Sequence, residues 1–326
     1  MPANDLWLYC DGKRPVILHY HIYKNAGSTI DSVLEREFGA FFSILSRDDP
    51  NAIISSGELI SFVEHNQSVL ALSSHQIRYP KPKSQQVEFF DLCFIRHPLD
   101  RLFSQYSFLL KPHVDDPLTG VARTTDLAGF CLFLLDRHPE YACNPQTNLL
   151  LNQGHSCSIC PDDLERARGL LRDIAVLGVV DAFDESFMVA EYALHPYFPR
   201  LRLHYCAQNV TNSGQMTFDQ RMEVIRLRCG AQLYARLLDS NRFDLALWHE
   251  ALLDLQRRLQ ARPDQEYCLE EFRRRTERYQ GGPLVRDKLL QWMKIRTQRA
   301  PNIQRTKRWP THGPSAMWLS YRARRR

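Results

Sequence analysis

Short apolar runs alternate with stretches of helical periodicity along most of the chain. Four runs are short, rich in β-branched and aromatic residues and followed by turn residues, which predicts buried strands at residues 16–22, 69–73, 89–95 and 174–180. A fifth strand is predicted at residues 201–205. Because helical segments separate these runs, the pattern indicates a parallel sheet with helices on both faces.

Helical spacing is clearest directly after the first predicted strand. One face of residues 28–38 carries Ile30, Val33, Leu34 and Phe38, and Gly39 is a suitable helix end. Further helices are predicted at residues 99–110 and 218–259. We therefore expect a main domain over residues 1–264 and a basic helical or irregular extension over residues 265–326. The best linker candidate is the Gly-Gly-Pro break at residues 280–283, and one more helix is expected at 284–293.

Composition is typical of an ordinary soluble globular protein and favours neither a membrane span nor a disulfide framework. Hydrophobic residues make up 44% of the 326 residues, yet no run reaches the ~18 apolar residues of a membrane span. The nine cysteines are scattered, which favours reduced thiols and a cytoplasmic location. Cys157 and Cys160 are a close pair near Cys143 and His155, but the spacing is irregular. We expect loop thiols there and no metal site.

Charge is uneven along the chain. From Gln265 onward there are 16 Lys+Arg against 5 Asp+Glu, whereas acidic residues are in excess before it. The basic end is most simply a solvated tail. It could also hold an acidic acceptor, or touch nucleic acid or anionic lipid. We expect no specific nucleic-acid partner.

The first candidate site joins the first predicted strand to its helix, in the sequence His-Ile-Tyr-Lys-Asn-Ala-Gly-Ser-Thr at residues 21–29. A helix N-terminus offers free N–H groups and a positive dipole end, so it binds anions. Gly27 permits close approach of an oxyanion, and Lys24 adds a mobile positive charge. The segment is not a Walker A loop, because its lysine precedes the glycine.

The second candidate site follows the third predicted strand, in Arg-His-Pro-Leu-Asp-Arg-Leu-Phe-Ser at residues 96–104. Arg96 leaves the strand end, Pro98 suits the first turn of a helix, and Ser104 lies two turns further on. An Arg-x-Pro sequence alone is usually structural. Beside a basic phosphate loop on a neighbouring strand, it indicates a second anion site.

The two segments together resemble the 5′-phosphosulfate loop and the 3′-phosphate motif of sulfotransferases that use PAPS (3′-phosphoadenosine 5′-phosphosulfate). The resemblance is to the carbohydrate, Golgi-type and family 2-like branch, and it covers residues 16–253 with weaker echoes at 144–147, 177–184 and 241–244. It implies a P-loop-like three-layer α/β fold with a central parallel sheet flanked by helices. Tyr23, Asn25 and His97 replace the family's usual proline, threonine and aspartate.

The resemblance also implies the site residues and the donor, PAPS. Lys24 would contact the bridging oxygen between sulfate and 5′-phosphate and take part in catalysis. The rest of the cofactor-binding loop is implied at Asn25, Ala26, Gly27, Ser28 and Thr29. Arg96 and Ser104 would hold the 3′-phosphate.

Sulfuryl transfer needs a base that takes the proton from the hydroxyl group of the acceptor molecule. His75 follows the second predicted strand, where similar enzymes place a catalytic histidine, and its reference pKa of ~6.5 suits the task. His21 is expected as a loop or supporting residue, and Glu58 and Glu64 are weaker alternatives. The acceptor, a carbohydrate hydroxyl by resemblance, is expected at residues 81–88, 111–126 and 141–160.

Two other functions stay open on the sequence. A P-loop kinase would bind ATP with Mg²⁺, but the missing Walker A pattern disfavours it. A catalytically inactive module would bind PAP (3′-phosphoadenosine 5′-phosphate) or PAPS without turnover.

Overall fold

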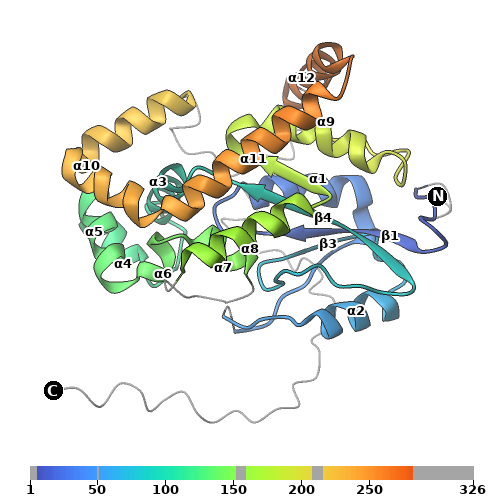
Figure 1. Cartoon of the computed structure of the whole chain (residues 1–326), viewed down its shortest axis with the longest axis horizontal. Helices are drawn as coiled ribbons and strands as arrows, with labels where there is room; N and C mark the ends of the chain where they lie inside the picture. The colour runs from blue at the N-terminus through green and yellow to red at the C-terminus, as the bar shows by residue number, and fades with distance from the viewer. Residues whose placement is uncertain (1–5, 50, 152–158, 208–215, 282–326) are drawn as a thin grey trace, which may run out of the picture.

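A single parallel sheet forms the centre of the protein (Figure 1), in a computed structural model that describes residues 6–49, 51–151, 159–207 and 216–281. The strands run in the order β2-β3-β1-β4-β5, and every pair of neighbours is parallel. They comprise β1 (Arg14–Tyr20), β2 (Phe42–Ile44), β3 (Ala71–Ser74), β4 (Val87–Ile95) and β5 (Val176–Val179). The predicted α/β fold with helices flanking a parallel sheet is confirmed.

Four of the five predicted strands are present, as β1, β3, β4 and β5. The prediction of a strand at residues 201–205 is wrong. Leu201 and Leu203 are buried, which explains the apolar alternation. The backbone N–H groups of Arg202 and Leu203 donate instead to the carboxylates of Glu37 and Glu191, at 3.2 and 2.6 Å. The fifth strand is β2, which has three residues and is too short for its pattern to show.

Helices flank the sheet and follow the strands along the chain (Figure 1). Their bounds are α1 (Gly27–Phe38), α2 (Ser56–His65), α3 (Pro98–Leu109), α4 (Thr119–Thr124), α5 (Leu127–Arg137), α6 (Pro139–Ala142), α7 (Pro145–Leu150), α8 (Pro161–Arg172), α9 (Phe183–Leu194), α10 (Phe218–Ser240), α11 (Arg242–Gln260) and α12 (Gln265–Gly281), with 3₁₀ turns at Gly39–Phe41 and Val180–Ala182. Gly39 ends α1 with φ of 51°. The helix predicted over residues 218–259 is interrupted twice: α10 is kinked at Gly230, which has a φ of 72°, and Asn241 separates α10 from α11.

The hydrophobic core has two parts. The larger part surrounds the sheet and includes Val16, Ile17 and Leu18 of β1, all fully buried. The smaller part joins α3, α4, α5 and α10 through residues such as Leu102 and Phe130. These helices lie together at one side of the sheet in Figure 1. α3 belongs to this second cluster and begins at the end of β4, so it links the two parts beside the candidate site.

The predicted domain boundary at residue 265 falls at the first residue of α12. This helix lies beside α9, and Phe272 is buried in the larger core. Arg275 of α12 donates to Glu191 of α9 at 2.7 Å. The division into two domains stays a prediction, and the expected helix at 284–293 and the basic tail after it lie outside the described residues. Within the described ranges, no helix has the length and apolar character of a membrane span.

Candidate active site

The carboxyl end of β1 leads into a tight loop and then α1. Lys24 and Ala26 adopt left-handed backbone conformations, with φ of 69° and 60°. Ala26 is the N-cap of α1, and no side chain caps this end of the helix. The first N–H groups of α1 are therefore not engaged by a capping side chain, which is the arrangement that binds oxyanions. Ser28 is exposed in the first turn, and Thr29 is buried.

Gly27 is required by the packing of this loop. A Cβ atom at residue 27 would lie 2.0 Å from the imidazole ring of His21. Only glycine leaves room for that ring at the start of α1. The steric role identified here differs from the predicted one, in which Gly27 lets an oxyanion approach, although both need a residue without a side chain.

Asn25 lies inside the loop. Its amide nitrogen donates to the carbonyl of Phe94 in β4 at 2.7 Å and to the side-chain oxygen of Gln146 at 2.8 Å. The side chain therefore ties the loop to β4 and α7. Cofactor binding by Asn25 stays a prediction, and in this structure its side chain has a supporting role.

Lys24 extends from the loop over α3. Its Nζ lies 4.0 Å from the ring centroid of Phe108. Burial, together with the nearby charges of Arg96, Lys111 and Arg101, lowers the pKa of Lys24 to about 7. Four cationic side chains in one place repel one another, and a bound anion would relieve that repulsion.

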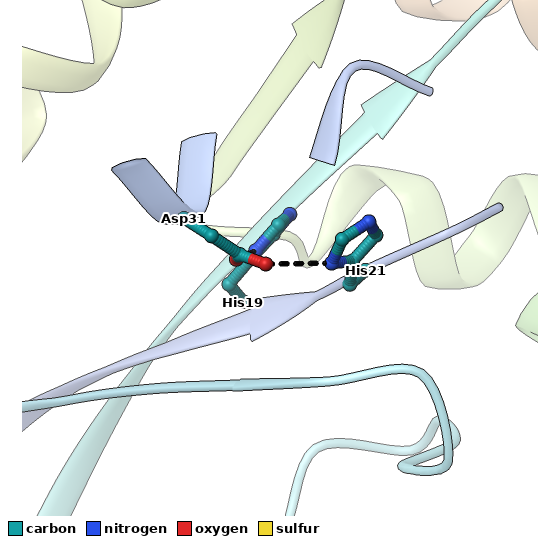
Figure 2. A group of neighbouring side chains, drawn as sticks. All are labelled: His19, His21 and Asp31. Carbon is teal, nitrogen blue, oxygen red and sulfur yellow. Dashed lines mark hydrogen bonds and ion pairs between the residues drawn. The ribbon is translucent and has the colours of Figure 1, made fainter. Parts of the chain in front are cut away.

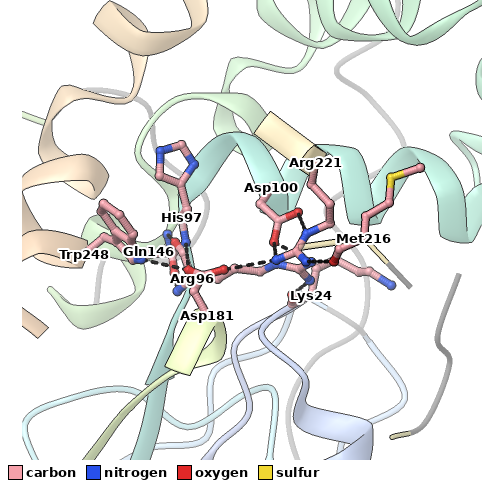
Figure 3. Close-up of polar contacts among 9 residues, drawn as sticks. All are labelled: Lys24, Arg96, His97, Asp100, Gln146, Asp181, Met216, Arg221 and Trp248. Atoms are coloured by element: carbon pink, nitrogen blue, oxygen red, sulfur yellow. Dashed lines mark hydrogen bonds and ion pairs between the residues drawn. The ribbon is translucent and has the colours of Figure 1, made fainter. Parts of the chain in front are cut away.

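Arg96 is fixed at the end of β4 (Figure 3). Its Nη1 donates to the main-chain oxygen of Lys24 at 2.9 Å, and its Nε donates to Asp100 of α3 at 2.8 Å. Asp100 is fully buried and also accepts a hydrogen bond from Arg221 of α10 at 2.9 Å. Burial alone would raise the pKa of Asp100, but Arg96 and Arg221 hold it below the usual range. The two candidate anion sites are thus directly connected.

Ser104 lies on the same side of α3. Residues 100, 104 and 108 are four apart, so they share one helix face. Asp100 contacts Arg96 and Phe108 contacts Lys24, which places the partly exposed Ser104 between the two cationic residues. This position is compatible with the predicted contact to a phosphate.

His97 replaces the family's usual aspartate and is accommodated in an aromatic pocket. Its ring centroid lies 4.9 Å from that of Trp248 and 5.4 Å from that of Phe218. Its backbone N–H donates to Asp181, which also accepts from the indole of Trp248 at 2.8 Å (Figure 3). Burial lowers the pKa of His97 to about 4, so the ring is neutral at neutral pH.

The weak sequence echoes meet behind these motifs. Gln146 is fully buried, and its side chain accepts from the backbone N–H of Arg96 at 2.9 Å and donates to the carbonyl of Arg96 at 2.8 Å. Asp244 accepts from the backbone and hydroxyl of Thr147 at 2.7 and 2.8 Å. Asn144 and Asn241 are also hydrogen-bonded to each other. Segments 144–147 and 241–244 therefore hold the backbone of Arg96 in place through Gln146 and Asp244.

Two further histidines and a carboxylate lie at the end of β1 (Figure 2). Nδ1 of His19 lies 2.8 Å from one oxygen of Asp31, and Nδ1 of His21 lies 2.9 Å from the other. Burial alone would raise the pKa of Asp31, but the hydrogen bonds from both histidines hold it well below the usual range. An ionised carboxylate only accepts, so both Nδ1 atoms carry hydrogen. The donor atoms are close enough for a metal ion, but hydrogen bonds account for their arrangement.

His75 lies against this cluster. Its Nδ1 is 2.7 Å from the main-chain oxygen of His21, and the two ring centroids are 3.7 Å apart. A carbonyl only accepts, so Nδ1 of His75 carries hydrogen and Nε2 holds the lone pair when the ring is neutral. Burial of the ring and the neighbouring His21 lower the pKa of His75 to about 3. The near-neutral pKa expected from the sequence is therefore wrong, and the ring is neutral at neutral pH. His75 as a residue is exposed.

Comparison with known proteins agrees with this geometry. The sequence model of the sulfotransferase family matches residues 9–248, which includes the loop, both anion motifs and the supporting segments. The chain belongs to the sulfotransferase family. An uncharacterized protein of Archaeoglobus fulgidus is similar, with 27% identity over 245 residues that cover 73% of this chain and 96% of that protein.

In this sulfotransferase the structure brings together most of the residues predicted from sequence. Lys24, Arg96 and Ser104 lie around one region, with α1 starting beside Lys24, and His75 lies next to His21. Of the weaker base candidates, Glu58 contacts Arg47 and caps α2, and Glu64 accepts from Ser84 at 2.7 Å. Of the close cysteine pair and its neighbours, Cys157 and His155 lie outside the described residues, and Cys160 is the N-cap of α8.

Sequence reasoning missed three residues with clear supporting roles. Asp31 orients His21, Arg221 holds Asp100, and Gln146 joins Asn25 in the loop before α1 to the backbone of Arg96 at the end of β4. A signal existed for Gln146, because it lies in one of the family echoes. None existed for Arg221, which lies 121 residues from its partner.

Proposed function

We propose that this sulfotransferase moves a sulfuryl group from PAPS to an acceptor hydroxyl, with His75 as the proton acceptor. The observation that carries the proposal is the link between the two anion motifs, in which Arg96 holds the main-chain oxygen of Lys24 at 2.9 Å. Two fixed cationic sites at the carboxyl ends of neighbouring parallel strands suit a nucleotide with two separate phosphate groups.

The residues divide the work as follows. The start of α1 and Lys24 would bind the 5′-phosphosulfate, and Arg96 and Ser104 the 3′-phosphate. The acceptor oxygen would attack sulfur in line with the bond to the bridging oxygen. Nε2 of His75 would take the hydroxyl proton, while Lys24 and the helix end stabilise the charge that develops on PAP. This scheme resembles phosphoryl transfer in depending on position and charge.

A carbohydrate hydroxyl is proposed as the acceptor from the family resemblance. The scheme needs no metal ion. Loss of the Lys24 contact in Lys24→Ala would slow turnover ~10²–10³-fold, as with other groups that stabilise a developing anion.

Calorimetric titration with PAP, using ATP with Mg²⁺ and AMP as comparisons, tests the donor. We expect PAP to bind selectively and Arg96→Ala to abolish binding. Arg137→Ala is the matched control, because Arg137 is exposed at the end of α5, away from the loop. A folded protein that does not bind PAP would remove the proposal, and preferential binding of ATP with Mg²⁺ would support a kinase.

Turnover distinguishes an enzyme from a module that only binds the nucleotide. Release of PAP from PAPS in the presence of carbohydrate acceptors, lost in Lys24→Ala, supports the enzyme. Tight PAP binding without PAPS consumption would support the inactive module.

A further inference from the structure

A narrow pocket opens beside the proposed base. It is lined by His21, His75 and Arg78, with Leu149 and Leu150 of α7 on the apolar side. The pocket has a volume of about 20 Å³, enough for one water molecule or one oxygen atom of a larger ligand. None of the described residues that line it is acidic.

Arg78 is the only basic side chain in this lining besides the two histidines, and it is buried, with 8% of its surface exposed. Its Nη1 donates to the main-chain oxygens of His75 and Ile77, at 2.7 and 2.9 Å. Its Nε is buried and has no hydrogen-bond partner among the described residues. The Nε–H and Nη2–H groups of an arginine can each donate to an oxygen of a carboxylate or a sulfate.

No carboxylate neutralises this guanidinium within the part of the chain that the structure describes. By contrast, Lys81 is paired with Asp91 at 3.0 Å, and Arg96 is paired with Asp100 at 2.8 Å. Burial lowers the pKa of Arg78, and no charged neighbour offsets that effect. A buried charge without a counter-charge costs free energy, and an anion supplied from outside would remove that cost.

We propose that Arg78 forms a subsite for an oxyanion of the acceptor, a carboxylate or a sulfate ester, beside the hydroxyl that His75 deprotonates. The inference rests on the proposed function, because it assigns the pocket next to His75 to the acceptor. Given the size of the pocket, one oxygen of the anionic group would enter it, and the remainder of the group and of the acceptor would stay outside. The site would therefore favour acceptors with an anion close to the reacting hydroxyl.

The test is NMR observation of the arginine Nε–H resonances in PAP-saturated protein. Arg78→Lys, which keeps a positive charge, identifies the Arg78 signal by its loss. Sodium glucuronate, glucose 6-sulfate and glucose are then titrated, so that carboxylate, sulfate ester and neutral sugar are compared on one ring. We expect an anionic sugar to shift the Arg78 signal and to bind at least about tenfold more tightly than glucose, as one charge-assisted hydrogen bond provides. In Arg78→Gln the preference disappears, and in Arg137→Gln it persists.

Equal affinity for glucose and both anionic sugars would overturn the proposal, as would a preference that survives in Arg78→Gln. An Arg78 signal that none of the three sugars shifts, up to their solubility, would also overturn it. Should Arg78→Gln not fold, the wild-type signal and Arg78→Lys still decide the outcome. Failure of PAP to bind would count against the proposed function. It is distinguished from failure of the Arg78 subsite because the sugars can also be titrated into the protein without nucleotide.

Discussion

Lys24 lies where three other cations approach it, and its properties follow from that position. Its reference pKa of ~10.4 falls to about 7 because the side chain is partly buried and close to Arg96, Lys111 and Arg101. The sequence identified Lys24 from a motif but gave no sign of this shift. Arg96 follows β4, Arg101 lies in α3 and Lys111 follows α3, so these neighbours are 72 or more residues along the chain.

The shift predicts how PAP affinity depends on pH. An anion favours charged Lys24, so binding would draw a proton onto the amine whenever the free protein has lost it. As pH rises from 7.5 to 9, above the free-state pKa of about 7, we expect PAP affinity to fall. The decrease reaches at most tenfold per pH unit. Calorimetry in buffers of different ionisation enthalpy measures the proton uptake directly.

Lys24→Arg provides the comparison, because an arginine stays charged over this range. It should bind PAP with an affinity nearly independent of pH between 7.5 and 9. Lys83→Arg, an exposed lysine in the loop before β4, should behave as wild type. A pH slope in Lys24→Arg equal to that of the wild type would show that another group titrates.

Asp31 predicts a second residue-scale effect, on the proposed base. The carboxylate holds His21, and the main-chain oxygen of His21 accepts from Nδ1 of His75. Its negative charge also favours protonated His75. We therefore expect Asp31→Asn to lower the pKa of His75 further and to reduce the fraction of the ring with hydrogen on Nδ1. Imidazole ¹⁵N NMR reads both quantities without any acceptor.

Glu35→Gln is the matched control, since Glu35 is an exposed acidic residue one turn further along α1. It removes the same charge without touching His21. If both variants shift the His75 resonance equally, the effect is general electrostatics and not the Asp31–His21 contact.

At the scale of elements, the sequence predicts what is local and misses what is not. β1, β3, β4 and β5 were visible because each is an apolar run with its own turn, and α1 and α3 because their faces are periodic. β2 has three residues, and the segment at 201–205 has the alternation of a strand with its N–H groups on Glu37 and Glu191. Whether such a segment forms a strand depends on hydrogen-bond partners in distant elements. These partners lie outside any short stretch of sequence around the segment.

Gln146 shows how an element supports the site from a distance. From α7 it bonds both backbone groups of Arg96 and the side chain of Asn25, so it joins β4 to the phosphate loop. Gln146→Ala leaves several buried polar groups without partners, at a cost of ~1–3 kcal/mol each before relaxation. We expect a lower free energy of unfolding in urea and weaker PAP binding.

Gln256→Ala, at an exposed position on α11, is the control for loss of a glutamine from a helix. Unchanged stability in Gln146→Ala would contradict the supporting role. Lower stability with full PAP affinity would show that the loop keeps its shape without the bridge.

At the scale of the whole molecule, basic residues are concentrated at the C-terminal end of the chain. Residues 265–326 carry 16 Lys+Arg against 5 Asp+Glu, although the chain as a whole has a net charge of only +5. Composition alone revealed this asymmetry. The sequence did not reveal that α12, which begins the basic end, places Phe272 in the larger core and pairs Arg275 with Glu191. Contacts between residues 84 apart are invisible to local patterns.

Deletion of the residues after Gly282 tests what the basic end contributes. Lys24, Arg96 and their partners all precede it, so PAP binding should be unchanged in the truncated protein. If the tail is only solvated, PAPS turnover with an anionic acceptor has the same salt dependence with and without it. If the tail holds an acidic acceptor, truncation raises the KM for that acceptor at low salt, and the difference vanishes above ~0.5 M salt because exposed charges are screened. A neutral acceptor of the same size is the control. Only an electrostatic role of the tail would make truncation affect the anionic acceptor and not the neutral one. A truncated protein that loses PAP affinity would instead show that residues beyond 282 support the fold or the nucleotide site.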